Sequence, residues 1–377
     1  MNKNQKAFFE ILKAGLWSDH RLVSSSKFHA SGDVDWVEVY QLAEEQSVVG
    51  LVATGIDCLP PDARPPQELT LQIIGEALQI EQQNKDMNKF LVELIEKLRG
   101  AGVYALLLKG QGIAQCYDKP LWRSCGDVDL FLSEENYIKA KSVLMPLAGA
   151  IEDEYVYTKH LGMTLKDWVV ELHGTLRCKL SPRIDKTLDE IQRDTFCQGN
   201  VRSWLNGRSQ VFLLSPENDA AYVFTHFLNH FYKEGLGLRQ ICDWCRLLFC
   251  YREKLDLRLL ELRIRKMGLM SEWKAFGAFA VEYLGMPKEA MPFYSADLKW
   301  KRKADKICAF VMEVGNFGHN RDMSHFGKYP FVVRKCISMG RRIGDIINHA
   351  KIFPMSSLRF FPRIMWNGVV SAVKGEG

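Results

Sequence analysis

The sequence lacks long apolar runs, because no stretch of 18 or more consecutive apolar residues occurs. We therefore expect no membrane span. The opening segment MNKNQKAFFEILKAGLW carries charges throughout and has no small-residue cleavage site, so it predicts an amphipathic helix and not a signal peptide. Without a secretion signal, we expect a cytoplasmic protein whose thiols are reduced.

Paired cysteines at zinc-site spacing are also lacking. Among the ten cysteines, Cys242 and Cys245 form a C-x-x-C, and no second pair lies at the spacing of a zinc site. The pair belongs to the helical stretch QICDWCRLLFC, which favours buried thiols over metal or redox work. The chain also has no internal repeat and no low-complexity tract, which argues against a solenoid or a disordered protein.

Charge is unevenly distributed along the 377 residues. The net charge is +5, but residues 328–377 hold nine Lys/Arg against two Asp/Glu, so the remainder is close to neutral. A basic, aromatic tail of this kind could contact an anionic partner such as nucleic acid or a membrane surface. The alternative is an ordinary solvated helical face.

Periodicity divides the chain into three regions and predicts an α+β fold. Apolar residues at three- and four-residue spacing predict a helical N-terminal region over 1–100. Short apolar runs that alternate with helical segments predict a small mixed-sheet α/β core over 101–210. The start signal Ser215-Pro216-Glu217 then introduces a helical domain over 211–377, with the basic tail at its end.

The segment DVDLFL places two acids on a strand that is otherwise apolar. Alternate side chains of a strand face opposite ways, so Val128, Leu130 and Leu132 share one face. Asp127 and Asp129 share the other face, roughly 7 Å apart at the backbone from the rise per residue. Two like charges at that distance raise each other's pKa unless a cation lies between them. Mg²⁺ suits this position, because it is held by carboxylates together with substrate phosphates.

A glycine turn precedes the acid pair. Gly110 follows the apolar run Tyr104–Leu108 and comes before QGIAQCYDKPLW, which predicts one helix broken before Pro120. The backbone N–H of Gly110 could therefore approach a phosphate. Lys109 adds a cation at the turn, and Arg123 lies just upstream of the acids. A phosphate site followed by metal-binding acids on the next strand is a working arrangement for phosphoryl or nucleotidyl transfer.

At this point the residues resemble a family. The pattern of strand, glycine turn, helix and Asp-h-Asp is similar to the nucleotidyltransferase superfamily typified by DNA polymerase β. More closely, KG…A…Y…P…R…GDVDLFL resembles a group of uncharacterised bacterial nucleotidyltransferases. The later ELH, the His-rich helix from Ser215 and the GNFG at Gly315–Gly318 are also similar to that group. The superfamily has Gly-Ser at the turn, whereas Gln111 follows Gly110 in this chain.

The resemblance implies a metal-dependent transfer of NMP from an NTP to an acceptor hydroxyl. It implies two Mg²⁺ ions, or Mn²⁺, held by Asp127, Asp129 and a third acid, for which we choose Glu171 of WVVELH. One ion would activate the hydroxyl, and the other would bind the triphosphate. Lys109, Gly110, Gln111 and Arg123 would position phosphates, and His173 would be a hydrogen-bonding or leaving-group partner.

The acceptor stays open, and a small molecule, a sugar, a protein or RNA would all fit. One alternative is a toxin-like nucleotidyltransferase that modifies RNA or protein, for which the basic tail would suit RNA. Another is a catalytically silent module that only binds nucleotide.

Three further sets of residues are weaker candidates for the functional site. His226 and His230 share a helix face, which is expected to be buried but could face the nucleotide cleft. Arg239 and Asp243 are spaced for a local ion pair. His160 precedes a predicted strand.

Overall fold

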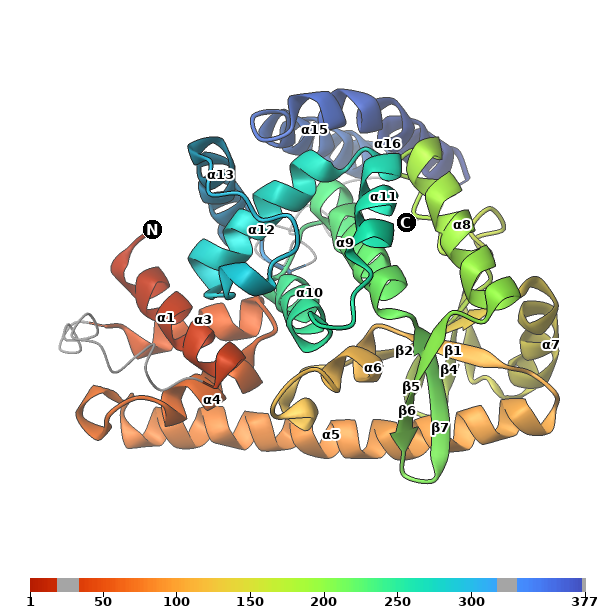
Figure 1. The fold of residues 1–377 in the computed structure, drawn as a ribbon, viewed down its shortest axis with the longest axis horizontal. Helices are drawn as coiled ribbons and strands as arrows, with labels where there is room; N and C mark the ends of the chain where they lie inside the picture. The colour runs from red at the N-terminus through yellow and green to blue at the C-terminus, as the bar shows by residue number, and fades with distance from the viewer. Residues whose placement is uncertain (19–33, 317–330, 375–377) are drawn as a thin grey trace.

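The computed structural model describes residues 1–18, 34–316 and 331–374. One seven-stranded mixed sheet lies among helices, which confirms the predicted α+β class (Figure 1). The strands are β1 Ala105–Leu108, β2 Asp127–Leu132, β3 Ala150–Ile151, β4 His160–Leu165, β5 Trp168–His173, β6 Val201–Asn206 and β7 Ser209–Leu214. The helices before β7 are α1 Lys3–Trp17, α3 Trp36–Glu45, α4 Val49–Asp57, α5 Gln67–Gly100, α6 Gly110–Ala114, α7 Glu134–Leu144 and α8 Pro182–Gln198. Those after it are α9 Pro216–Lys233, α10 Leu238–Cys250, α11 Leu257–Met267, α12 Met270–Leu284, α13 Leu298–Val314, α15 Phe331–Ala350 and α16 Pro354–Lys374.

Helix α5 links the N-terminal helices to the sheet. Its 34 residues span about 50 Å at the α-helical rise, and it runs beneath both parts in Figure 1. Ile73 and Ala77, in its first half, belong to the core shared with α1 and α4. Leu91 and Leu94, in its second half, belong to the core beneath the sheet. The helix ends at Gly100, near Gly102 with φ +71°, as the two glycines predicted.

The sheet has the order β3-β4-β5-β2-β1-β7-β6. β2 pairs antiparallel with β1 and parallel with β5, and β1 pairs parallel with β7. Strand alternation separates the two faces of β2 as the sequence predicted. Val128, Leu130 and Leu132 lie in the core formed with α5 and α7. The opposite face carries the acids and looks toward the C-terminal helices.

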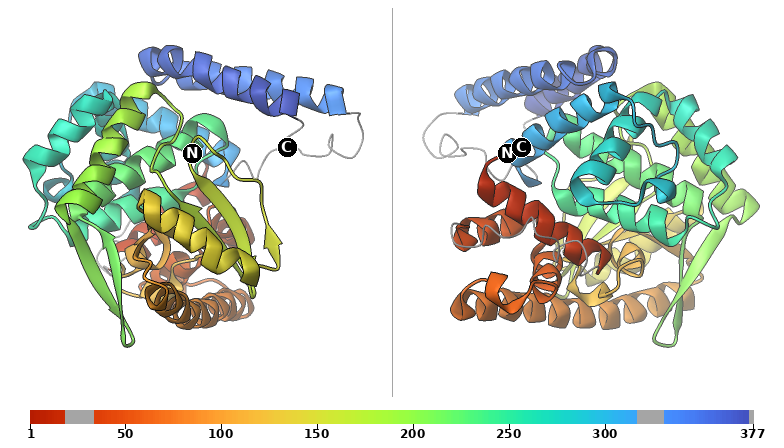
Figure 2. Two further views of the ribbon diagram at one scale, coloured as in Figure 1. Left: turned by 90° about the vertical axis from the view of Figure 1, so that its right-hand side faces the viewer. Right: turned by 60° about the vertical axis from the view of Figure 1, so that its left-hand side comes forward.

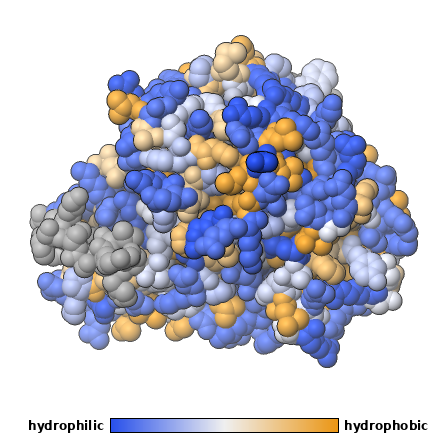
Figure 3. All heavy atoms as spheres, viewed as in Figure 1, coloured by the Kyte–Doolittle hydropathy of each residue, from blue (hydrophilic) through white to orange (hydrophobic). Residues whose placement is uncertain are grey.

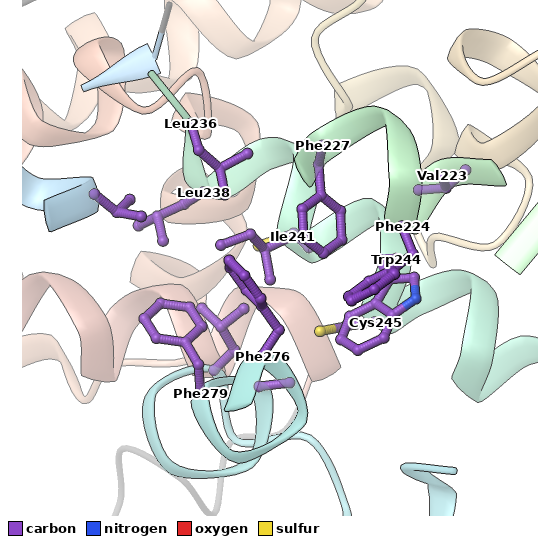
Figure 4. Close-up of a cluster of buried hydrophobic side chains, with 14 of the residues drawn as sticks. Val223, Phe224, Phe227, Leu236, Leu238, Ile241, Trp244, Cys245, Phe276 and Phe279 are labelled. Carbon is purple, nitrogen blue, oxygen red and sulfur yellow. The ribbon is translucent and has the colours of Figure 1, made fainter. Parts of the chain in front are cut away.

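The helices that follow the sheet pack around aromatic side chains. Figure 4 shows Phe227 of α9, Trp244 of α10 and Phe276 of α12 meeting in this core. The ring centroids of Phe227 lie 5.6 Å from Trp244 and 5.0 Å from Phe276. Cys242 and Cys245 are fully buried here, which confirms the prediction of buried thiols. This core fixes α9 and α10, whose other sides face the sheet.

The basic C-terminal segment forms α15 and α16, which lie together at the top of both views in Figure 2. Two of its cations contact the rest of the chain. Arg359 donates to Ser181 Oγ at 2.8 Å, and Arg363 lies 2.9 Å from Asp185 of α8. These two residues are therefore engaged within the chain and do not form a purely solvated face. Of the GNFG motif, Phe317 and Gly318 lie outside the described residues.

Two local predictions were wrong in extent. The helix expected over QGIAQCYDKPLW, with a break before Pro120, ends earlier, because α6 stops at Ala114 and a short 3-10 turn starts at Pro120. Between them, Arg246 of α10 donates to the carbonyl of Cys116 at 2.7 Å, so that carbonyl serves a tertiary contact. The strands β6 and β7 were missed, and β7 runs across the boundary predicted at residue 210. Asn206-Gly207, a common hairpin turn, was the available signal.

On the face seen in Figure 3, hydrophobic residues of the described part of the chain gather near the centre and elsewhere lie in small groups among hydrophilic ones. Among the described helices, none is both long and apolar enough to cross a membrane.

Candidate active site

Strand register brings three carboxylates together. β2 and β5 are parallel neighbours, with Asp129 opposite Glu171 and Asp127 opposite Val169. Oxygen atoms of Asp127, Asp129 and Glu171 all lie within 4.8 Å of one another. All three side chains lie on the face directed at α9 and α10. The sheet therefore assembles the acid cluster from two segments about 40 residues apart in the sequence.

Lys109 meets this cluster from the end of β1. Leu108 is the register partner of Asp129, so the next residue reaches the acid, and Lys109 Nζ lies 3.1 Å from Asp129 Oδ2. Burial lowers the pKa of Lys109, but attraction to Asp129 and the neighbouring acids together raises it overall. Lys109 has φ +49° and Gly110 has φ +41°, a left-handed turn that is costly for lysine and suits glycine. Such strain is common at functional sites.

Two histidines of the neighbouring strands complete the cluster. His173 Nε2 donates to Asp129 Oδ1 at 2.8 Å and lies 3.4 Å from Glu171 Oε2. His160, the first residue of β4, pairs with His173 in register and lies 3.0 Å from Glu171 through Nε2. Burial lowers the pKa of His173, but its hydrogen bonds to Asp129 and Glu171 raise it overall.

The three acids differ in how they are neutralised. Burial raises the pKa of Glu171, but hydrogen bonds from His160 and His173 lower it overall. The Asp127 side chain has no hydrogen-bond or ion-pair partner among the described residues, and repulsion from Asp129 and burial raise its pKa. A buried acid of this kind is costly without a cation. Carboxylate oxygens at this spacing fit a hard divalent cation such as Mg²⁺ or Mn²⁺.

Two connected chambers flank the cluster, and Lys109, Glu171 and His226 line both. The large chamber has a volume of about 940 Å³ and is bordered by the loops around Tyr155 and Lys179. The small chamber has a volume of about 200 Å³. Ligand pockets for whole small molecules are typically about 300–1,000 Å³, so the small chamber suits only part of a substrate.

Of the remaining predicted phosphate ligands, two line the small chamber and one lines neither chamber. Gly110 and Arg123 line the small chamber. Arg123 Nε and Nη2 are already bonded to Asp243 at 3.0 and 2.6 Å. Gln111 is buried and donates to Asn84 of α5 at 2.7 Å, so its side chain lines neither chamber. Its position gives no support to the predicted phosphate contact, because α6 turns it toward α5.

The structure shows where His226 points and which partners Arg239 and Asp243 have. His226 does face the cleft: its Nε2 accepts from Lys109 Nζ at 3.3 Å, and His230 Nε2 lies 3.0 Å away. The ion pair expected between Arg239 and Asp243 was wrong. Asp243 pairs with Arg123 of the sheet region, and Arg239 donates to the carbonyl of Ser124 at 2.7 Å. Spacing within one helix could not show that α10 packs on the loop before β2.

His160 lies beside the acid cluster, which its place before a predicted strand did not indicate. With Glu171 and His173 it forms a second group of side chains that could hold a metal. The two groups share Glu171, so the ligand set alone leaves open which of them is used. The pairing of His160 with Glu171 depends on the β4–β5 register, which the sequence did not reveal.

A family match covers the part of the chain that forms this site. The family described as uncharacterised nucleotidyltransferase matches residues 32–285, which extend from before α3 to the end of α12. That match includes the acid cluster, the Lys109 turn and both α9 and α10, and leaves out α13, α15 and α16. Neither the curated proteins nor the solved structures contain a match. Because the family covers about two thirds of the sequence, the chain belongs to this family of nucleotidyltransferases.

Proposed function

We propose that the protein is a divalent-metal-dependent, polymerase β-like nucleotidyltransferase that moves an NMP from an NTP to an acceptor hydroxyl. One observation carries the proposal: the carboxylates of Asp127, Asp129 and Glu171 converge within 4.8 Å of one another in the lining of the small chamber, and Glu171 also lines the large chamber. Membership of a nucleotidyltransferase family supports the reaction class.

The side chains around the acids have distinct tasks in this proposal. Asp127, Asp129 and Glu171 would hold the divalent cation, which supplies charge neutralisation at the phosphates and activates the acceptor hydroxyl. Lys109 and His173 hold Asp129 from two sides and fix its orientation. His160 holds Glu171 in the same way. Such supporting contacts keep metal-binding carboxylates in place.

A transfer assay tests the proposal. The protein is incubated with Mg²⁺ and each α-labelled NTP, with and without cell extract, and labelled products are separated. We expect label transfer by the wild type and a loss of about 10²–10³-fold or more in Asp127→Asn and Asp129→Asn, because each removes charge stabilisation from the transition state.

Asp305→Asn provides the matched control. Asp305 lies on α13, outside the family match, and accepts a hydrogen bond from Tyr283 at 2.7 Å. This variant should transfer label as the wild type does. Unchanged transfer in both active-site variants would refute the site assignment. Nucleotide binding without transfer to any acceptor would favour the silent module.

A second observation favours RNA as the acceptor. Tyr155 and Tyr157 are about half exposed at the border of the large chamber. Lys179 Nζ lies 5.6 and 5.5 Å from their ring centroids, and the Arg177 guanidinium lies 5.5 Å from that of Tyr157. Aromatic rings beside cations are a common way to bind single-stranded nucleic acid. The toxin-like reading with an RNA acceptor is therefore our second candidate.

A further inference from the structure

Arg239 of α10 is a cation that the proposed reaction has not yet used. Its Nη1 donates to the carbonyl of Ser124, and its Nε is buried without a hydrogen-bond partner. Within the described part of the chain, no carboxylate forms an ion pair with it. Burial and the neighbouring Arg123 lower its pKa, whereas Asp243 acts in the opposite direction. A buried guanidinium in this state is expected to have an anionic partner supplied from outside the chain.

The small chamber is where that partner would lie. Arg239 and Arg123 both line it, and Nη1 of Arg123 is also buried without a partner. Asp127 and Asp129 line the same space. Two arginines, each with one buried donor that lacks a partner, therefore border a chamber that also contains the acid cluster. A guanidinium binds phosphate oxygens through parallel hydrogen bonds, which makes arginine a common phosphate ligand.

We propose that Arg239, together with Arg123, binds the β- and γ-phosphates of the NTP in the small chamber. This inference rests on the proposed function and gives the two chambers separate ligands. The chamber volume of about 200 Å³ suits a phosphate tail and leaves the large chamber to the acceptor.

The reaction fits this division. The acceptor oxygen forms a bond to the α-phosphorus, and the oxygen that bridges the α- and β-phosphorus atoms leaves with the bonding electron pair. Pyrophosphate is the leaving group, and the hydroxyl proton is released to the medium. Negative charge therefore grows on the β-phosphate side, where Arg239 would stabilise it. Arg239 would contact the leaving group directly.

Calorimetric titration in Mg²⁺ tests the inference with three probes: NTP, the matching NMP and inorganic pyrophosphate. Arg239→Gln should weaken NTP and pyrophosphate binding by about 10- to 100-fold, the usual effect of losing a charged hydrogen bond. NMP binding should change by less than about twofold, because NMP has no β- or γ-phosphate. Pyrophosphate should compete with NTP for the wild type. Arg239→Lys should recover part of the affinity, and it carries the test if Arg239→Gln does not fold.

Arg263→Gln is the matched control. Arg263 is also buried with an unpartnered Nη1, but it pairs with Asp194 and lines neither chamber. Its variant should bind all three probes as the wild type does.

The possible outcomes separate the inference from the proposed function. Unchanged NTP binding in the Arg239 variants would overturn the inference and leave the function intact. An equal loss for NMP would show a purely structural role and also overturn it. Simultaneous binding of pyrophosphate and NTP would assign the anion site to a phosphorylated acceptor instead. A wild type that binds no NTP would end both proposals.

Discussion

The two chambers share one wall but are built from different kinds of structure. The small chamber lies among regular elements: Val223 and Phe227 of α9, Gln240 of α10 and the turn after β1. The large chamber is bordered mainly by loops, in which Lys159 and Lys179 have φ of +45° and +60°. Parts of a site that must hold one geometry are best placed on packed helices and strands. Loops vary more readily and often determine what is bound. The difference indicates that the small chamber holds the phosphates in one fixed geometry, whereas the large chamber can adapt to the acceptor.

Breaking the buried ion pair between Arg123 and Asp243, beside the small chamber, should give the largest loss of stability. Asp243 accepts from Arg123 and from Tyr117, and both the aspartate and the arginine are buried. Asp243→Ala leaves the Arg123 charge uncompensated and should lower the free energy of unfolding by about 3–5 kcal/mol. The shift of the thermal or denaturant midpoint measures the loss.

Asp57→Ala serves as the control for that change. Asp57 forms an exposed ion pair with Lys119, whose loss should cost under about 1 kcal/mol. If Asp243→Ala were no more destabilising than Asp57→Ala, the small chamber would not be the rigid side of the site.

Changes on the large chamber should affect the acceptor and leave the nucleotide alone. Tyr155 is stacked on His160 with ring centroids 5.8 Å apart and remains about half exposed. If an RNA base stacks there, Tyr155→Ala should weaken acceptor binding by about 5- to 100-fold, the range seen for single stacked bases. NTP affinity should stay unchanged. Binding of a labelled single-stranded RNA, measured at several salt concentrations, checks both expectations.

Tyr104→Ala provides the matched control, because Tyr104 is also exposed and lies just before β1, outside both chambers. RNA affinity should fall steeply as salt rises. Equal weakening in the two tyrosine variants, or an affinity that salt does not change, would argue against an RNA acceptor.

The sequence predicted the local parts of this arrangement and missed the parts that depend on packing. Strand alternation placed Asp127 and Asp129 on one face correctly, because side-chain direction in a strand is set by the chain itself. Glu171 was placed beside them only through the family resemblance, and its role stays a prediction. The partner of Arg239 was wrong, since helix spacing says nothing of the loop on which α10 packs. The position of His160 depends on packing in the same way, because the β4–β5 register places it beside His173 and within 3.0 Å of Glu171.

The smallest expected effect concerns the wall that the two chambers share, which is formed by Lys109, Glu171 and His226. It appears as a pH dependence of stability. Burial, Lys109 and His230 hold the pKa of His226 well below its usual value, whereas Glu171 acts weakly in the opposite direction. Below about pH 6.5, the unfolded chain therefore binds a proton that folded His226 does not, so acid lowers stability through this residue. The slope from one such group is at most about 1.4 kcal/mol per pH unit.

His226→Gln removes this titration and should reduce the loss of stability on acidification. Denaturant midpoints at pH 7, 6 and 5 measure it, and the contributions of other groups cancel when the two proteins are compared. Because His226 accepts from Lys109, a neutral imidazole keeps that cation available to Asp129 and to both chambers. Parallel stability curves for the two proteins would mean that His226 is protonated in the folded state. Lys109 would then lie beside a positively charged imidazole. The repulsion between the two side chains would weaken the hold of Lys109 on Asp129.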